Sequence, residues 1–349
     1  MIFLNGVPFH THDHISSSSS NENGTLLALM NHPTLVSASE SIKAIPERKF
    51  KIPEESCPGR LEKSKWVYLF QREYATADPA LVDFIGTDEA TTCVGFAIRN
   101  RKNGITSVAH MDSPNIVDKG LDQMLSSFID RCLDDDLDVH MIGSFEDSSP
   151  DHGSDKSGSE SDENLDGHSF SLCSKIIETL MMKEEKFHFQ TLCVLAHNTK
   201  KDSEGNACPI FNGLVIEMST GSVIPASFDT TSRCPDEIVR RIRVTSSYEH
   251  HKWDGKLLET YNTLTDRFEI APCRWTWRQE RIARRLRDLS DSEVLHLCST
   301  SPSAEAPDFV ANERRKWEYL IQHPNWNETF PMEQPRVFKR TADGDWRRC

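Results

Sequence analysis

A cysteine and a histidine at the outer ends of two neighbouring apolar runs are the residues of this sequence best placed to do chemistry. Cys93 opens the run CVGFAI, His110 closes the run ITSVAH, and the Asn103-Gly104 pair between them is a hairpin turn signal. If Arg99 and Gly104 close the turn, Cys93 lies directly opposite His110, with Cβ atoms about 4.5–5.5 Å apart. A thiol and an imidazole so placed can form a nucleophilic thiolate–imidazolium pair.

This interpretation depends on the register of the hairpin, because a shift of one residue would turn the two side chains to opposite faces. The alternative is that Cys93 is a buried strand residue and His110 an ordinary histidine at a strand end. Pattern alone does not decide between these two interpretations.

The polar segment GTDEATTC leads into Cys93 and fits the catalytic interpretation. It contains Thr87, Asp88, Glu89, Thr91 and Thr92 immediately before an apolar strand. These residues could supply backbone N–H groups for an oxyanion, and a hydroxyl or carboxylate to orient the histidine. The alternative is an ordinary turn rich in threonine and acidic residues.

A second candidate site is the histidine-rich segment from His10 to His14. A His-x-His pair after a strand is typical of several metal-dependent hydrolases. Here the spacing HTHDH is one residue short of His-x-His-x-Asp-His, and a serine tract follows at once. We therefore favour a loop, and keep a metal-dependent hydrolase as an alternative; His250-His251 is a weaker candidate.

A basic stretch near the C-terminus could be proposed as an RNA contact. Residues 273–289 contain six arginines and two tryptophans, but Ile282, Leu286 and Leu289 give this stretch a helical apolar face. The net charge of the chain is −14, which argues against a nucleic acid as the main partner. We therefore interpret the arginines as the solvated face of a helix.

The charge is unevenly distributed along the 349 residues. Residues 146–166 carry eight acidic side chains and one lysine, half of the net charge, and almost no apolar residues. Such a segment cannot offset its ordering entropy by burial, so we predict a disordered insert there. Residues 10–24 are predicted to be a low-complexity loop.

The composition also indicates the cellular compartment in which the protein is expected. The longest apolar runs, such as LLALM, are far shorter than the ~20 residues that span a bilayer. No secretory signal is visible, and the ten cysteines include no Cys-x-x-Cys pair. We therefore expect reduced thiols and a protein of the cytoplasm or nucleus, without a membrane or nucleic-acid partner.

Hydrophobic periodicity predicts a mixture of strands and helices in no regular βαβ order, which favours an α+β fold with largely antiparallel sheets. Ser290 with Glu293 forms a capping-box pattern, and Asp308 is a candidate helix cap. The predicted strands are 1–9, 66–70, 93–98, 105–110, 138–143, 187–196, 211–219, 222–228 and 263–272. The predicted helices are 25–45, 120–133, 170–182, 235–243, 293–297 and 309–322.

Five stretches in this order resemble the family of eukaryotic protein N-terminal asparagine amidohydrolases, in a plant-like form. They are VYLFQRE (67–73), GTDEATTC (86–93), AHMDS (109–113), PASF (225–228) and STSPSAEAPDFV (299–310). The resemblance implies that the cysteine closing Thr-Thr-Cys, here Cys93, is the nucleophile. It also implies a single amidohydrolase domain over residues 1–349.

A more distant likeness links the chain to bacterial chemoreceptor glutamine deamidases and to cytotoxic necrotizing factor toxins. These enzymes use a Cys–His pair on adjacent strands of a layered α-β-β sandwich, and in the former a threonine precedes the cysteine by six positions. The histidine follows by seventeen, which gives Thr87 and His110 here. The hairpin and the resemblance thus indicate the same pair by different routes.

The resemblance implies hydrolysis of an N-terminal asparagine to aspartate with release of ammonia, at the head of the N-degron pathway. Its substrates are proteins or peptides with a free N-terminal Asn, and it implies no metal or organic cofactor; we expect a monomer. The cationic α-amine of the substrate should meet a carboxylate. The candidates for substrate binding are Glu73, Asp88, Glu89, Asp112, Ser299 and Ser301. A non-catalytic binder of N-termini remains a third alternative.

Overall fold

The computed structural model describes residues 1–10, 24–52, 64–128, 136–147, 167–342 and 344–349. Most of the segment from His10 to His14, the low-complexity loop and the acidic insert lie outside these residues, so those predictions remain predictions. None of the helices in the described ranges is long and apolar enough to cross a membrane.

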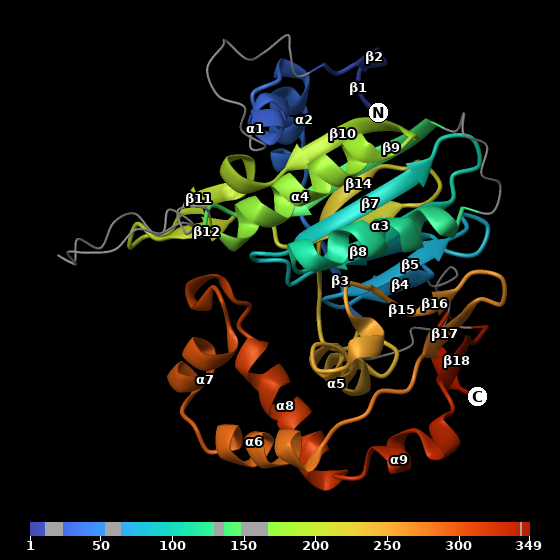
Figure 1. The fold of residues 1–349 in the computed structure, drawn as a ribbon, viewed down its shortest axis with the longest axis vertical. Coiled ribbons are helices and arrows are strands. Elements are labelled where there is room, and N and C mark those ends of the chain that lie inside the picture. Colours follow the sequence, from blue (N-terminus) through green and yellow to red (C-terminus); the bar gives the residue numbers. More distant parts are fainter. Residues whose placement is uncertain (11–23, 53–63, 129–135, 148–166, 343) are drawn as a thin grey trace.

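Two stacked sheets form the centre of the fold (Figure 1). The main sheet has eight strands in the order β15-β5-β8-β7-β9-β10-β1-β2, and the second sheet has the order β3-β14-β13-β6-β4. The bounds in the main sheet are β1 Ile2–Leu4, β2 Val7–Pro8, β5 Glu73–Ala77, β7 Val94–Asn100, β8 Thr106–Met111, β9 Asp136–Gly143, β10 Lys186–Cys193 and β15 Leu258–Glu259. Those in the second are β3 Arg48–Phe50, β4 Trp66–Leu69, β6 Phe84–Thr87, β13 Leu214–Glu217 and β14 Val223–Phe228.

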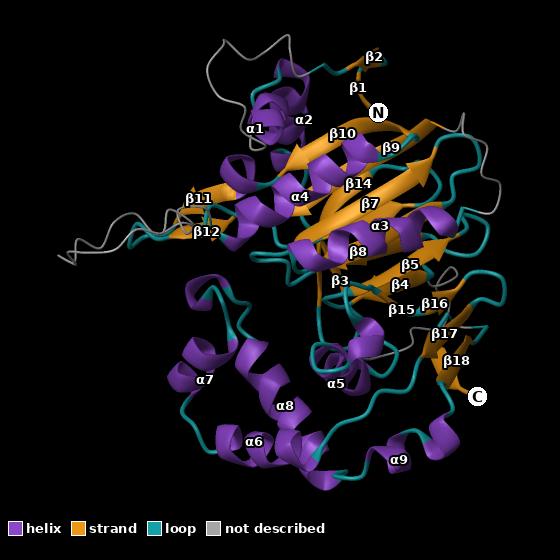
Figure 2. Cartoon of the chain, in the orientation of Figure 1, coloured by secondary structure: helices purple, strands orange, loops and turns teal. Residues whose placement is uncertain are grey.

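Helices α3 Val117–Ser126 and α4 His168–Met182 cover the outer face of the main sheet, which gives three layers in the order α-β-β (Figure 2). Helix α1 Gly24–Met30 packs against α4, and α2 Pro33–Lys43 lies beside β10, where Ser39 Oγ donates to the Leu192 carbonyl oxygen. Side chains alternate along each strand, so β7 presents Phe96 to the helices and Ala97 to the second sheet. The α+β class is confirmed. The sheets mix antiparallel pairs with parallel ones such as β9–β10 and β4–β6.

The C-terminal third adds helices and a small sheet beside the sandwich (Figure 1). The helices are α5 Glu237–Ser247, α6 Trp277–Arg287, α7 Asp291–Cys298, α8 Phe309–Gln322 and α9 Trp326–Thr329. The small sheet contains β16 Tyr261–Asn262, β17 Arg267–Ile270, β18 Arg336–Arg340 and β19 Trp346–Arg348, and a separate pair contains β11 Thr199–Lys201 and β12 Ala207–Pro209. The basic stretch contains the predicted helix, α6, but its buried side chains are Gln279 and Ala283; Leu286 and Leu289 are partly buried, and the predicted Ile282 is exposed.

Most predicted elements lie where periodicity placed them, with local corrections. The predicted helix 25–45 is two helices, because Pro33 occupies the first turn of α2 and interrupts the chain. The capping box of Ser290 and Glu293 is confirmed. The predicted cap of α8 is wrong in detail, since the Asp308 side chain makes no capping hydrogen bond and pairs with Arg233 instead.

The predicted register of the central hairpin was wrong by two residues. Gly95 pairs with His110 and Arg99 with Thr106, and the backbone N–H of Asn100 donates to the Ile105 carbonyl oxygen at 2.9 Å, so the turn holds residues 101–104. The Asn100 side chain accepts a hydrogen bond from the backbone N–H of Lys102, which stabilises this turn. A shift of two residues preserves the face of every side chain, so the face shared by Cys93 and His110 survives the correction.

Candidate active site

His110 points from β8 of the main sheet into the space between the two sheets, where it meets Thr87 of β6. The distance between Thr87 Oγ1 and His110 Nδ1 is 2.8 Å, and both residues are buried. Gly95 lies opposite His110 on β7, and a Cβ there would come within 3.2 Å of Thr87 Cγ2. The glycine therefore allows the close approach of the two sheets at this point.

The hydrogen bonds of Thr87 fix the tautomer of the imidazole. The Thr87 hydroxyl donates to the Leu69 carbonyl oxygen at 2.7 Å, and a carbonyl oxygen can only accept. With its single proton used there, Thr87 Oγ1 accepts from His110 Nδ1–H. Nε2 of the neutral ring then carries the lone pair, and it has no hydrogen-bond partner among the described residues. A neutral imidazole nitrogen with a free lone pair can accept a proton, as a general base must.

Cys93 lies just before β7 on the face that His110 occupies, and both residues line one cavity of about 530 Å³. We call residues 88–93 the nucleophile loop. The backbone N–H of Ser144 donates a hydrogen bond to the Cys93 carbonyl oxygen at 2.7 Å and so stabilises this loop. The Ser144 hydroxyl also donates to the carbonyl oxygens of Thr92 and Cys93. These hydrogen bonds hold Cys93 in place beside the cavity that His110 also lines.

Burial sets the resting charges of the pair. It lowers the pKa of His110 to about 4, against the opposing effect of Glu89 and Glu73. Burial, with the negative charges of Asp112 and Glu305, raises the pKa of the Cys93 thiol well above its usual range. Both shifts favour a neutral thiol and a neutral imidazole at rest, and formation of the thiolate–imidazolium pair considered from the sequence then requires transfer of the thiol proton to Nε2.

Among the carboxylates predicted to grip the substrate, Glu73 is a structural residue. It is fully buried and pairs with Arg240 at 2.6 Å and with Arg243 at 2.5 Å. Burial alone would favour the neutral acid, but the two arginines outweigh it and lower the pKa of Glu73. It does not line the cavity that contains Cys93.

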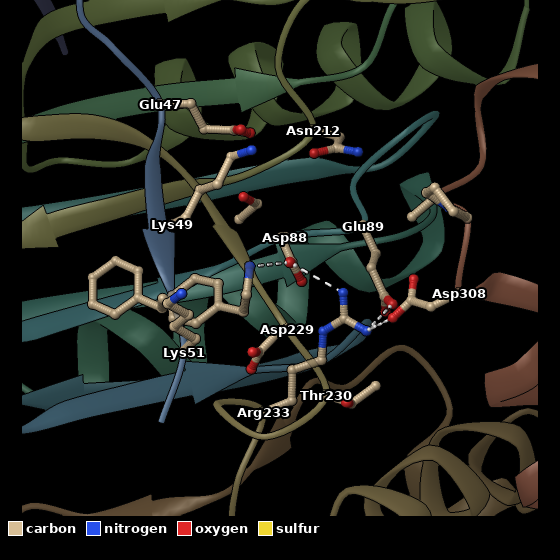
Figure 3. Close-up of a pocket in the computed structure, with 15 residues that line it drawn as sticks. Glu47, Lys49, Lys51, Asp88, Glu89, Asn212, Asp229, Thr230, Arg233 and Asp308 are labelled. Atoms are coloured by element: carbon tan, nitrogen blue, oxygen red, sulfur yellow. Dashed lines mark hydrogen bonds and ion pairs between the residues drawn. The ribbon is translucent and has the colours of Figure 1, made fainter. Parts of the chain in front are cut away.

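Asp88 and Glu89 form ion pairs with arginines. Figure 3 shows their pairs with Arg233. Arg233 is 3% exposed and contacts Asp88 at 3.3 Å, Glu89 at 2.9 Å and Asp308 at 2.7 Å. Glu89 also takes two 3.0 Å hydrogen bonds from Arg241. Burial opposes ionisation of Glu89, but Arg241 and Arg233 outweigh it and lower its pKa to about 2.

This arginine cluster connects two walls of the site. Asp88 and Glu89 belong to the nucleophile loop, whereas Asp308 immediately precedes α8. The cavity of about 480 Å³ shown in Figure 3 lies on the far side of the loop and includes Asp88 but neither Cys93 nor His110. Asp88 therefore does not face the nucleophile, and Glu89, which borders both cavities, already has its charge neutralised.

Asp112 is the predicted carboxylate that faces the cavity and keeps an oxygen free. Continuing the hairpin ladder by one step puts it opposite Cys93. Its Oδ2 accepts hydrogen bonds from the Tyr248 hydroxyl and, at 3.5 Å, from Gln71. Its Oδ1 is buried without a hydrogen-bond partner in the described part of the chain. An oxygen in that state needs a donor, and a substrate can supply one.

The loop of residues 299–305 forms the wall across from the hairpin. Ser301 Oγ donates to Thr91 Oγ1 at 2.9 Å, and Thr92 and Thr300 hydroxyls lie 3.2 Å apart. Ser299 lines the cavity, whereas Ser301 is buried in the loop contact. Of the two predicted serines, the first can reach a substrate and the second fastens the loop.

Sequence reasoning missed three side chains in the cavity. Tyr248 at the end of α5 orients Asp112, Arg241 of α5 neutralises Glu89, and Glu305 ends the 299–305 loop. The segment STSPSAEAPDFV includes Glu305, but Glu305 and Cys93 are far apart in the sequence and come to line the same cavity only in the folded chain. The described residues contain no cluster of three or more potential metal ligands, and His12, Asp13 and His14 lie outside them.

A buried thiol and an imidazole with a fixed tautomer share one cavity, an arrangement typical of cysteine hydrolases. The family model of protein N-terminal asparagine amidohydrolase matches residues 57–348. The chain is 53% identical to the protein N-terminal asparagine amidohydrolase of Arabidopsis thaliana, over the full length of both proteins. It is 27% identical to that of Mus musculus and 26% identical to that of Homo sapiens, each over 89% of this chain and 93% of the relative.

The chain therefore belongs to the protein N-terminal asparagine amidohydrolase family, and it is an amidohydrolase. The family's mouse and human members are similar over nearly their whole length, so the likeness covers the sandwich and the C-terminal helices together.

Proposed function

We propose that the protein deamidates an N-terminal asparagine through a thioester on Cys93. The observation that carries this proposal is the unpartnered Nε2 of His110, which shares one cavity with the Cys93 thiol. Nε2 accepts the thiol proton as Sγ attacks the carboxamide carbon of the substrate. Collapse of the tetrahedral intermediate breaks the C–N bond, and the same proton leaves with ammonia.

Hydrolysis of the thioester uses the same groups in the second half of the reaction. His110 Nε2 removes a proton from water, the resulting hydroxide attacks the thioester carbon, and the sulfur leaves and regains a proton from the imidazolium. Thr87 keeps the ring in the required tautomer throughout, because its oxygen accepts from Nδ1–H in both the neutral and the cationic form. The likeness to Cys–His deamidases supports this sequence of steps.

The substrate α-amine is assigned to Asp112. The nitrogen of an N-terminal Asn is three bonds from the carboxamide carbon, so its anchor must lie close to Cys93. Asp112 meets this requirement and has one free oxygen, whereas the oxygens of Glu73, Asp88 and Glu89 already face arginines. Internal asparagines are refused because an amide without charge replaces the ammonium.

The product carries an N-terminal aspartate, which places the reaction at the head of the N-degron pathway, before arginylation and ubiquitination. The proposed setting is the cytoplasm or nucleus, with the enzyme as a monomer. The test of the activity is incubation with an Asn-initiated peptide: mass spectrometry should show a gain of about 1 Da with release of ammonia, and Cys93→Ala should abolish both. An unchanged peptide mass with the parent enzyme would refute the proposal.

A further inference from the structure

A second carboxylate, Glu305, lines the same cavity as Asp112 and acts with it to raise the pKa of the Cys93 thiol. Glu305 lies at the end of the 299–305 loop, is partly buried, and lines the cavity that also contains Cys93, His110 and Asp112. The Ser299 hydroxyl donates a hydrogen bond to its Oε1. Its Oε2 makes no hydrogen bond with the described residues, so this oxygen remains available to a molecule bound in the cavity.

Contacts on both sides of Glu305 in the sequence hold its loop in position. Ser301 and Thr300 bond to Thr91 and Thr92, the two residues before the nucleophile. At the far end Asp308 is held by Arg233, which also holds the nucleophile loop through Asp88 and Glu89 (Figure 3). The position of Glu305 relative to Cys93 is thus set by direct links between the two loops, as a group that reads the substrate requires.

We propose that Glu305 is the residue that distinguishes the substrate carboxamide from the product carboxylate. This inference rests on the proposed function, because it assumes that the reacting side chain lies at Cys93. The carboxamide of Asn offers two N–H donors, one of which Glu305 accepts. The carboxylate of the Asp product offers no donor and brings a negative charge to a cavity that already contains Asp112 and Glu305. The same contact that binds substrate therefore expels product.

The charge environment of Glu305 supports this role. Burial raises its pKa to about 7, and the neighbouring carboxylates Glu89 and Glu313 act in the same direction, whereas Ser299 and Arg241 oppose them. The other charged or titratable groups that line the cavity are Cys93, His110, Asp112, His168, Tyr248, Cys298 and Lys316, of which Lys316 pairs with Glu313. Glu305 therefore gains its charge near neutral pH, so repulsion of the product should grow across that range.

The test compares the parent enzyme with Glu305→Gln in two assays: turnover of an Asn-initiated peptide, and inhibition of that turnover by the matching Asp-initiated peptide. Gln retains an oxygen that accepts from Ser299 and from the carboxamide, but it has no charge. We expect the variant to have a higher KM for the Asn peptide, because a neutral oxygen replaces a charged acceptor. The ratio of Ki for the Asp peptide to KM for the Asn peptide should fall at least about tenfold, because a like-charge contact is removed. In the parent enzyme this inhibition should weaken as the pH rises toward about 7, below the range of about 7.7–8.0 in which the peptide α-amine loses its charge. In the variant the dependence below that range should be lost.

Two further variants keep the test decisive. Glu318→Gln changes the net charge equally at an exposed position of α8 and should leave inhibition by the Asp peptide unchanged. Glu305→Asp keeps the charge but shortens the side chain, and should still repel product while its KM for the Asn peptide rises. Equal inhibition of the parent enzyme and Glu305→Gln would overturn the inference even if both enzymes release ammonia. Loss of ammonia release by the parent enzyme would instead contradict the proposed function.

Discussion

Thr87 and His110 belong to different sheets, and the 2.8 Å hydrogen bond between Thr87 Oγ1 and His110 Nδ1 joins the two sheets at the active site. The bond holds the imidazole with its basic nitrogen toward the cavity that contains Cys93. The packing of the sandwich and the chemistry of the site therefore depend on the same contact.

Replacing Thr87 with valine should lower kcat by at least about tenfold, because Nδ1–H loses its acceptor and the ring is no longer held in one tautomer. The Leu69 carbonyl also loses its donor, so stability should fall by about 1–3 kcal/mol. Thr87→Ser retains the hydroxyl and should restore most of kcat. Steady-state kinetics and thermal unfolding of both variants check this, and equal kcat in Thr87→Val and the parent enzyme would exclude the positioning role.

The pH dependence of kcat/KM should have an acid limb close to pH 4 rather than 6.5, because burial lowers the pKa of His110 to about 4. Below that pH the imidazolium cannot accept the thiol proton, so activity is lost as pH falls and is present above it. On the alkaline side, activity should decline as the substrate α-amine loses its charge, around pH 7.7–8.0. A pH profile measured with the free enzyme and limiting peptide gives both values. An acid limb at about 6.5 that persists in Glu305→Gln would mean that His110 is solvated in the working enzyme.

Asp112→Asn should raise KM for an Asn-initiated peptide by about 10- to 100-fold, since the ammonium loses its counter-charge, while kcat changes less. Tyr248→Phe removes the hydroxyl that orients Asp112 but keeps the carboxylate, so it is the matched control with a smaller effect. N-acetylated Asn peptides should neither bind nor react. Gln-initiated peptides should bind and react poorly, because the carboxamide is displaced from the sulfur and misplacement by about 1 Å can lower the rate ~100-fold. Efficient turnover of the acetylated peptide would rule out an amine anchor.

Replacing residues 148–166 with a short Gly/Ser linker should leave stability and turnover essentially unchanged. The acidic tract has almost no apolar residues to contribute to a core. The described chain on its two sides is already joined, since Asp147 Oδ2 accepts from the backbone N–H of Ser169 at 3.3 Å. Thermal unfolding and peptide turnover of the shortened chain test this. A loss of both would show that the tract forms part of the folded enzyme.

The closeness of Cys93 and His110 could be predicted from sequence because it depends on local pairing within one hairpin. The turn signal and the alternation of the strands put Cys93 and His110 on one face, and the resemblance added Thr87. The register itself was wrong by two residues, since Asn100 and Ile105 close the turn in place of Arg99 and Gly104. Face is a robust property of a strand, whereas register depends on details of the turn.

The substrate carboxylates could not be ranked from sequence, because their roles depend on partners far along the chain. Glu73 is neutralised by Arg240 and Arg243 of α5, and Glu89 by Arg241 and Arg233. Glu305 reaches the nucleophile only through hydroxyl contacts between residues some 210 positions apart. No local pattern encodes these contacts, and so Ser299 and Ser301 were predicted to bind substrate while Glu305 in the same segment was given no role.

A covalent bond between Cys93 and the substrate can be detected directly by mass spectrometry of the intact protein. A reaction with an Asn-initiated peptide is quenched rapidly with acid. We expect an adduct equal to the peptide mass less one ammonia, located on Cys93 and absent from Cys93→Ser. That variant should fold and bind peptide but lose turnover by on the order of 10³-fold or more, while Cys208→Ser, outside the cavity, retains it. Near-normal turnover by Cys93→Ser, or an adduct on another cysteine, would contradict the account.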